Sequence, residues 1–265
     1  MTEVKTSVSL LDQLLAPGGL TVLFQPIFAL TGEAPRRHAL ECQVRGPVGT
    51  NFEDSSVLYE YARHKRAESL IDRASIVTAL QTVAALLPLN QWTIHLHATT
   101  IGSDQNFTQF LLSHAELNRI SPSRLVVEIA EQGAPWDQVI FSNTLEQLRA
   151  NGVRIALGSF GKSANYHLLL DCQPDFINLD RYLVSNAGHD QRRRVILNSL
   201  ARLAEQFEAE VIADGVENKA DLKALIEAGI RLGQGSLLSH PLPADALSAF
   251  VMKAEAAEAM TQSVI

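Results

Sequence analysis

The sequence predicts an α/β fold, a single TIM-type (β/α)8 barrel with an extra helix at each end. Eight short apolar runs of strand type occur along the chain, most of them separated by helical segments, and a polar residue stands at the end of most runs. Strand–helix–strand units form parallel sheets, and a barrel of eight units takes about 250 residues. An open doubly wound sheet is the competing fold, but it usually carries a glycine-rich loop after its first strand, where this chain has Gln25 and Pro26.

Local signals define each predicted element in order. A serine N-cap and leucines at helical spacing predict a first helix over residues 7–15, which Pro17, Gly18 and Gly19 end. Residues 52–87 are predicted to form two helices that break near Arg66. The predicted strands are residues 20–24, 38–44, 92–98, 125–129, 153–157, 176–179, 210–213 and 230–233. The other predicted helices are residues 104–117, capped by Asp104, 136–150, 191–207, 219–228 and 244 to the C-terminus.

Composition limits the class of protein. The chain has 265 residues, 46% of them hydrophobic, and a formal net charge of −7, so the overall field repels nucleic acid. Cys42 and Cys172 lie far apart and suggest reduced thiols rather than a disulfide framework. No signal segment and no apolar run of membrane-spanning length is evident. We therefore expect one cytoplasmic domain over residues 1–265 with no membrane or nucleic-acid partner.

The polar residues at the strand ends predict a functional site. In a barrel of parallel strands, chemistry collects at the carboxyl ends of the strands. The fifth strand differs from the others because it ends in Gly158 and Ser159, where an acid would be useful. The other strand ends carry Gln25, Glu41, His95, Glu128, Asp180, Asp214 and Gln234.

Eight short motifs occur in a fixed order between about residues 10 and 248: Gln-Pro-Ile at 25–27, Glu-Cys-Gln-Val-Arg-Gly at 41–46, Asp-Arg at 72–73, Glu-Ile-Ala-Glu at 128–131, Phe-Gly at 160–161, Ile-Asn-Leu-Asp at 177–180, Ala-Asp-Gly-Val-Glu at 213–217, and Gln-Gly at 234–235 followed by Pro241. This series resembles the EAL family of metal-dependent phosphodiesterases, which linearise cyclic di-GMP. The resemblance implies an EAL-type barrel over almost the whole chain.

The departures from the family pattern bear on activity. The resemblance places Glu41 and Glu128 at metal-ligand positions, but His95 stands at the position of a ligating asparagine. Gly158 and Ser159 replace the two aspartates of Asp-Asp-Phe-Gly, Asn178 replaces the catalytic lysine, and Asp214 shortens a glutamate. Hydrolysis with two metals needs carboxylates that bridge both ions. We therefore expect a degenerate phosphodiesterase with no catalytic residue set intact and no required cofactor.

Two interpretations of the remaining acids stay open. In the first interpretation, a remodelled site for a single divalent metal is formed by Glu41, His95 and Glu128. In the second, a protonated His95 balances two carboxylates that would otherwise repel each other.

Several residues match family positions that contact the nucleotide, and they leave more than one class of function open. The resemblance assigns this role to Gln25, Arg45, Asp180, Glu217 and Gln234, and an arginine suits a phosphate. We expect a catalytically inactive regulatory protein of cyclic di-GMP signalling that acts as a nucleotide receptor, a protein-binding module, or both. The alternative is an interaction module that no longer binds nucleotide, with a regulatory partner protein. The third class is an active phosphodiesterase with a rebuilt His/Glu site. The altered loop after Phe160 lies where family dimers form, so a dimer is also expected as one option.

Overall fold

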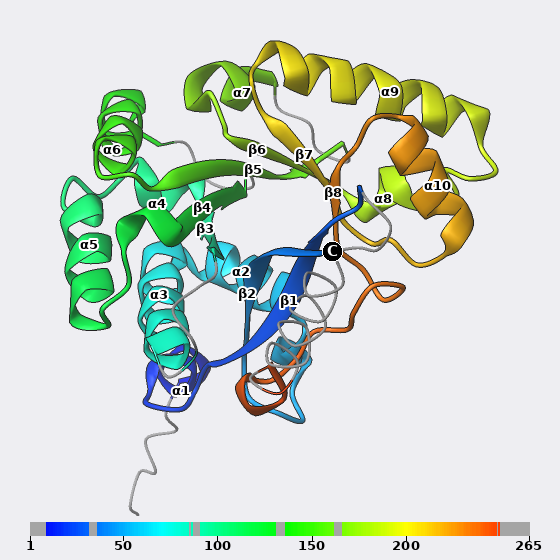
Figure 1. The fold of residues 1–265 in the computed structure, drawn as a ribbon. Coiled ribbons are helices and arrows are strands. Elements are labelled where there is room, and N and C mark those ends of the chain that lie inside the picture. The colour runs from blue at the N-terminus through cyan, green and yellow to red at the C-terminus, as the bar shows by residue number, and fades with distance from the viewer. Residues whose placement is uncertain are drawn as a thin grey trace, which may run out of the picture.

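The computed structural model describes residues 9–31, 36–84, 86, 91–130, 136–161, 166–247 and 249. In these residues eight strands close into one barrel in chain order, with helices around it (Figure 1). The strands are β1 Thr21–Ala29, β2 Arg36–Arg45, β3 Trp92–His97, β4 Leu125–Ala130, β5 Arg154–Phe160, β6 Phe176–Leu179, β7 Glu210–Ala213 and β8 Leu232–Gly233. The predicted α/β barrel is confirmed, and each predicted strand is present.

Helices follow most strands and cover the outside of the barrel. They are α1 Leu10–Leu15, α2 Ser55–Lys65, α3 Glu68–Ala84, α4 Ala98–Ile101, α5 Phe107–Leu117, α6 Gln138–Ala150, α7 Tyr166–Cys172, α8 Arg181–Val184, α9 Gln191–Gln206 and α10 Lys219–Glu227. The predicted break near Arg66 is confirmed, because Arg66 is the left-handed C-cap of α2 with φ 51°. The helix expected from residue 244 falls largely outside the described residues.

The direction of the first strand differs from an all-parallel barrel. β1 runs antiparallel to both β2 and β8, whereas β2 to β8 run parallel to one another. Only residues 30–35 connect β1 to β2, and a parallel pair needs a crossover of a dozen or more residues. The short connection therefore forces the chain to reverse, and the strict (β/α)8 pattern fails at its first unit.

One predicted cap is wrong. Helix α5 begins at Phe107 with Asn106 as its N-cap, so Asp104 lies before the helix. Asp104 instead accepts a bond from the Asn106 backbone N–H at 3.0 Å and pairs with Arg73 of α3. The two oxygens of this carboxylate thus serve a local backbone donor and the ion pair with α3.

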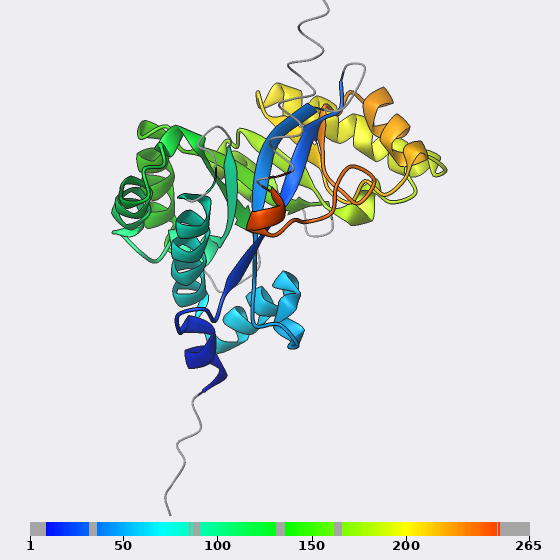
Figure 2. The same ribbon diagram turned by 60° about the horizontal axis from the view of Figure 1, so that its bottom comes forward.

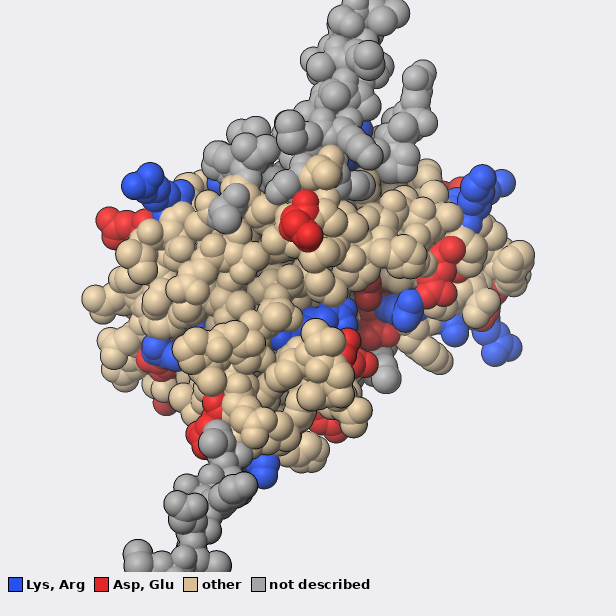
Figure 3. Space-filling view, turned by 90° about the horizontal axis from the view of Figure 1, so that it is seen from below, with Lys and Arg blue, Asp and Glu red and all other residues tan. Residues whose placement is uncertain are grey.

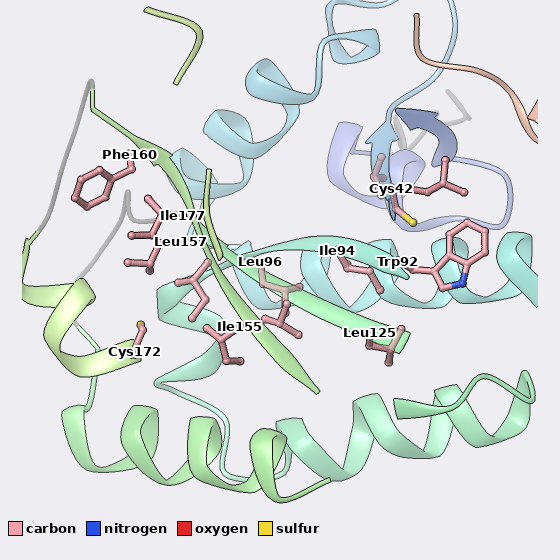
Figure 4. Close-up of a cluster of buried hydrophobic side chains, with 14 of the residues drawn as sticks. Cys42, Trp92, Ile94, Leu96, Leu125, Ile155, Leu157, Phe160, Cys172 and Ile177 are labelled. Atoms are coloured by element: carbon pink, nitrogen blue, oxygen red, sulfur yellow. The ribbon is translucent and has the colours of Figure 1, made fainter. Parts of the chain in front are cut away.

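The barrel strands separate two hydrophobic layers. Side chains that alternate outward from the strands pack beneath the helices, as the labelled residues of Figure 4 show. On β4, Leu125, Val127 and Ile129 belong to this outer layer, whereas Val126 belongs to a smaller cluster inside the barrel. The next inward position after Val126 is Glu128, so the barrel interior changes from apolar to polar toward the carboxyl ends of the strands.

Two features outside the main ring complete the molecule. Helices α1 and α2 project from the same side of the barrel (Figure 2), and α2 contacts α3 and β2. The face in Figure 3 carries small groups of both charge signs separated by uncharged side chains. Within the described residues, no helix is long and apolar enough to cross a membrane.

Candidate functional site

A cavity of about 530 Å³ opens where the polar layer of the barrel meets helix α2. Its barrel side is formed by residues from β2, β3, β4, β5 and β6 and by the segments after β6, β7 and β8, and its other wall is a face of α2. Three basic side chains, Arg63, His95 and His97, line it. Five carboxylates also line it: Glu41, Glu60, Glu128, Asp180 and Asp214. The lining is therefore strongly acidic.

His95 lies between two buried carboxylates. Its Nε2 atom is 2.6 Å from Oε1 of Glu41 and 3.4 Å from Oε2 of Glu128. Parallel pairing brings His95 of β3 opposite Glu128 of β4, and Glu41 comes from β2 on the other side. The sequence-predicted trio is therefore brought together, in the arrangement of an internal ion pair.

The charges of this trio shift the pKa of each member. Burial lowers the pKa of His95, but the charges of Glu128 and Glu41 outweigh burial and raise it to about 10. Burial alone would raise the pKa of Glu41, yet the charge and hydrogen bond of His95 hold it below its ordinary value. Glu128 shows the opposite balance, because burial and the charge of Glu41 raise its pKa to about 7 despite His95. Together these shifts favour one imidazolium between the acids.

Two amide side chains extend the network. Nε2 of Gln234 donates to Oε2 of Glu41 at 2.5 Å and to Oδ1 of Asp214 at 3.1 Å. Nδ2 of Asn178 donates to Oε1 of Glu128 at 3.2 Å. Burial and the charge of Glu41 raise the pKa of Asp214 to about 6. Asn178 therefore supports Glu128 as a neutral hydrogen-bond donor, in the position where a lysine would add a positive charge.

The end of β5 carries no acid and is irregular. The register with β6 shifts between Leu157 and Phe160, and Ser159 adopts a left-handed backbone with φ 52°. A Cβ added at Gly158 would lie 2.5 Å from Oε1 of Glu128. The carboxylate of Glu128 thus occupies the space beside Gly158 that a larger side chain would need.

Of the five residues expected to contact a nucleotide, the structure places two on the cavity lining and three elsewhere. Asp180 and Gln234 line the cavity, and Asp180 also caps α8 through the Tyr182 backbone N–H. Gln25, Arg45 and Glu217 do not line it. Each of them has at least one other hydrogen-bond or ion-pair partner.

Those partners lie within the fold. Gln25 donates to the carbonyl of Ser239 at 2.8 Å. Arg45 donates to Oε1 of Gln43 at 2.9 Å and to the carbonyl of Glu53. Glu217 pairs with Arg181 on an exposed part of the surface.

The two histidines of β3 do not act as a pair. Residues two apart on a strand share a face, which predicts a common environment for His95 and His97. His97 is instead the last residue of the strand, and its Nδ1 lies 2.9 Å from Oδ1 of the fully buried Asp72 on α3. Both histidines line the cavity, but they have different carboxylate partners, because α3 offers His97 a carboxylate of its own.

Sequence reasoning missed the wall that α2 adds to the cavity. Ser55, Ser56, Tyr59, Glu60 and Arg63 line it from this helix. They recur at intervals of three to four residues, which is the spacing of one helix face. That spacing was present in the sequence, but nothing local indicated which way the face would turn.

The residues present do not fit the metal centre that the fold suggests. No set of three or more His, Cys, Asp or Glu side chains in the described residues is placed to hold a metal ion. The Nε2 atom of His95, one of its two nitrogens that can bind a metal, is bonded to Glu41. A metal that bound here would have to displace this contact, and β5 would supply no carboxylate in return.

Comparison with known proteins identifies the chain. The family model described as "EAL domain" matches residues 8–241. The chain belongs to the EAL domain family. Its closed α/β barrel accordingly matches solved EAL structures.

Similar proteins include larger signalling proteins. This EAL domain is 32% identical over 156 residues to the bifunctional diguanylate cyclase/cyclic di-GMP phosphodiesterase MucR of Pseudomonas aeruginosa, covering 58% of this chain and 22% of that one. It is 28% identical over 147 residues to the blue light- and temperature-regulated antirepressor BluF of Escherichia coli, covering 55% and 36%. These matches therefore span about a fifth to a third of each relative.

Solved structures agree on the fold. A calcium and cyclic di-GMP complex of Klebsiella pneumoniae BlrP1 is 25% identical, with a TM-score of 0.73, and the match covers 85% of this chain and 56% of that one. A standalone EAL protein of Vibrio cholerae O395 in its cyclic di-GMP-bound form is 23% identical, with a TM-score of 0.74, over 85% and 93% of the two chains. The EAL domain described above thus belongs to a cyclic di-GMP signalling family.

Proposed function

We propose that this EAL domain is a regulatory module of cyclic di-GMP signalling that does not hydrolyse the dinucleotide. The observation that carries the proposal is the end of β5, where Gly158 and Ser159 offer no carboxylate and Glu128 fills the adjoining space. Two-metal hydrolysis of a phosphodiester depends on carboxylates that bridge the ions. The amide of Asn178 cannot accept or supply a proton as a general acid or base does.

The same cavity argues for action through protein contacts. A dinucleotide with two phosphates would face five carboxylates, and without a metal this like-charge contact is repulsive. Arg45, the arginine expected to bind phosphate, is held by Gln43 and Glu53 instead. The domain would then regulate a partner protein by binding it, without binding cyclic di-GMP. Two buried cysteines, Cys42 and Cys172, accord with the reducing cytoplasm as its location.

A receptor for intact cyclic di-GMP is the second candidate function. It is favoured by Asp180 and Gln234, which remain on the cavity lining, and by Arg63, which supplies a guanidinium on the opposite wall. In this case Arg63 would take over the phosphate contact that Arg45 does not make.

Calorimetric titration of cyclic di-GMP into the protein tests both candidates. The titration is run with EDTA and again with Mn²⁺, and the recovered nucleotide is separated by chromatography. We expect no saturable heat and no linearised product. Saturable heat with intact nucleotide, lost in Arg63→Ala and kept in Arg45→Ala, would establish the receptor. Linearised product with Mn²⁺ would overturn the proposal.

A further inference from the structure

The cavity contains two buried hydrogen-bond acceptors with no partner. Asn178 and Gln234 are 6% and 2% exposed, and both line the cavity. Their amide oxygens, Oδ1 and Oε1, form no hydrogen bond with any described residue. Buried polar atoms in native proteins almost always have a partner, so these two oxygens indicate a missing donor.

The orientation of both amides follows from their neighbours. The Asn178 nitrogen faces Glu128, and the Gln234 nitrogen faces Glu41 and Asp214. An ionised carboxylate only accepts hydrogen bonds, so the NH₂ groups point to the acids while these are ionised. In that state the network itself leaves the two oxygens unpaired, and rotating the amides would only turn the oxygens toward the carboxylates.

The charge of the cavity has the same imbalance. Five carboxylates line it against three basic side chains, Arg63, His95 and His97, and His97 is engaged by Asp72. His95 is already engaged by Glu41 and Glu128. Among the described residues no ion pair is formed by Asp214, although the charge of Arg181 acts on it, and Gln234 is its side-chain hydrogen-bond donor. The carboxylates of the cavity thus outnumber its cationic side chains, and the two amide oxygens remain without a donor.

We propose that this cavity binds an organic cation, a guanidinium or alkylammonium group, through Asp214, Gln234 and Asn178. A guanidinium carries five N–H donors in one plane, so a single group can serve carboxylate and amide oxygens together. A divalent metal fits less well, because no set of three acidic or histidine ligands is suitably placed in the described residues. The group would come from an arginine or lysine side chain of a partner protein or from a free amine. The inference rests on the proposed function, since a nucleotide in the same cavity would exclude it.

Thermal shift and calorimetry of the whole chain test the chemistry. The probes are N-acetylarginine amide, agmatine and a short arginine-containing peptide, with N-acetylcitrulline amide as the neutral, nearly isosteric control. We expect the three guanidinium probes to raise the Tm and the citrulline compound to leave it unchanged. Binding of the peptide much more tightly than agmatine indicates a partner's side chain as the source, whereas the reverse order indicates a free amine.

Variants locate the binding. Asp214→Asn removes one charge, and Asn178→Lys places an ammonium in the cavity, so each should weaken guanidinium binding by about tenfold or more. Glu205→Gln, an exposed acid on α9, should leave binding unchanged. If circular dichroism shows that Asn178→Lys does not fold, the Asp214→Asn variant still tests the inference. Equal binding of the citrulline compound, or no loss in Asp214→Asn, would overturn the inference.

The outcome also separates this inference from the proposed function. No guanidinium binding together with intact cyclic di-GMP after incubation with Mn²⁺ would overturn the organic-cation site alone. Linearised dinucleotide under the same conditions would overturn the proposed function as well.

Discussion

His95, Glu41, Glu128 and Asp214 share one buried network, so the protonation of each depends on the others. Glu128 and Asp214 have raised pKa values of about 7 and about 6, against ordinary values of 4.5 and 3.8. An acid whose pKa is raised on folding stabilises the fold fully below its ordinary pKa, and this contribution is lost as pH rises through its folded pKa. His95, raised to about 10, contributes with the same sign over a higher range.

Stability should therefore fall between about pH 4 and about pH 7, where Glu128 and Asp214 hold their protons longer in the folded state than in the unfolded chain. Below about pH 4.5 the sign reverses for Glu41, whose lowered pKa means that its contribution is lost in acid. Chemical denaturation at a series of pH values measures this slope.

A matched pair of variants assigns the slope to its source. Glu128→Gln should flatten the pH dependence, because the group that titrates near neutral pH is gone. Glu116→Gln, an exposed acid on α5, should leave the slope as in the wild type. A slope that survives Glu128→Gln unchanged would contradict the assignment.

The sequence predicted which residues meet in the mouth better than it predicted how they bond. Glu41, His95 and Glu128 could be grouped because strand ends converge in a barrel and because the family motifs fix their register. The direction of Arg45 could not be predicted, since it depends on Gln43 and on the backbone of Glu53. Which partner a side chain bonds depends on the tertiary structure, and the hydrophobic periodicity of the local sequence does not predict it.

Among the elements, α3 and the β3–α4 junction are joined by one buried carboxylate. Asp72 accepts bonds from the His97 backbone N–H at 2.8 Å and from the Thr100 hydroxyl at 2.5 Å, and it contacts Nδ1 of His97. All three groups belong to the segment that carries His95 into the mouth. Asp72 therefore fixes the strand end from the outside of the barrel.

Asp72→Ala should destabilise the protein by roughly 3 kcal/mol or more, because several buried donors lose their acceptor at once. Urea denaturation measures the change. Glu227→Ala, which removes an exposed pair with Lys223 on α10, is the control and should have little effect. A loss for Asp72→Ala no greater than the control would show that the junction does not depend on this carboxylate.

The reversal of β1 shows where element-level prediction was incomplete. The strand itself was predicted from its apolar residues, and its antiparallel direction follows from the short connection before β2. The short connection that determines this direction was therefore visible in the sequence. The bulge after Leu157 is different, because it depends on pairing with β6 and no residue type there demands it.

For the whole molecule, the ion pair of His95 predicts indifference to divalent metals. Mn²⁺ or EDTA should change the Tm by less than about 1 °C, whereas occupancy at 100 times the Kd would add about 2.7 kcal/mol and several degrees. Differential scanning calorimetry at matched ionic strength measures this, with NaCl as the control for screening. A rise of several degrees with Mn²⁺ that disappears in His95→Ala would contradict the prediction.

The closure of the barrel has a consequence for synthesis. β1, among the first strands made, pairs with β8, among the last, through only Phe28–Gly233 and Ala29–Leu232. During translation the backbone groups on one edge of β1 therefore remain unpaired until nearly the whole domain has been made. A ribosome that stalled before residue 232 would leave two strand edges open, on β1 and β7, and such edges pair readily with other chains. The nascent domain should thus depend on chaperones most heavily just before the barrel closes.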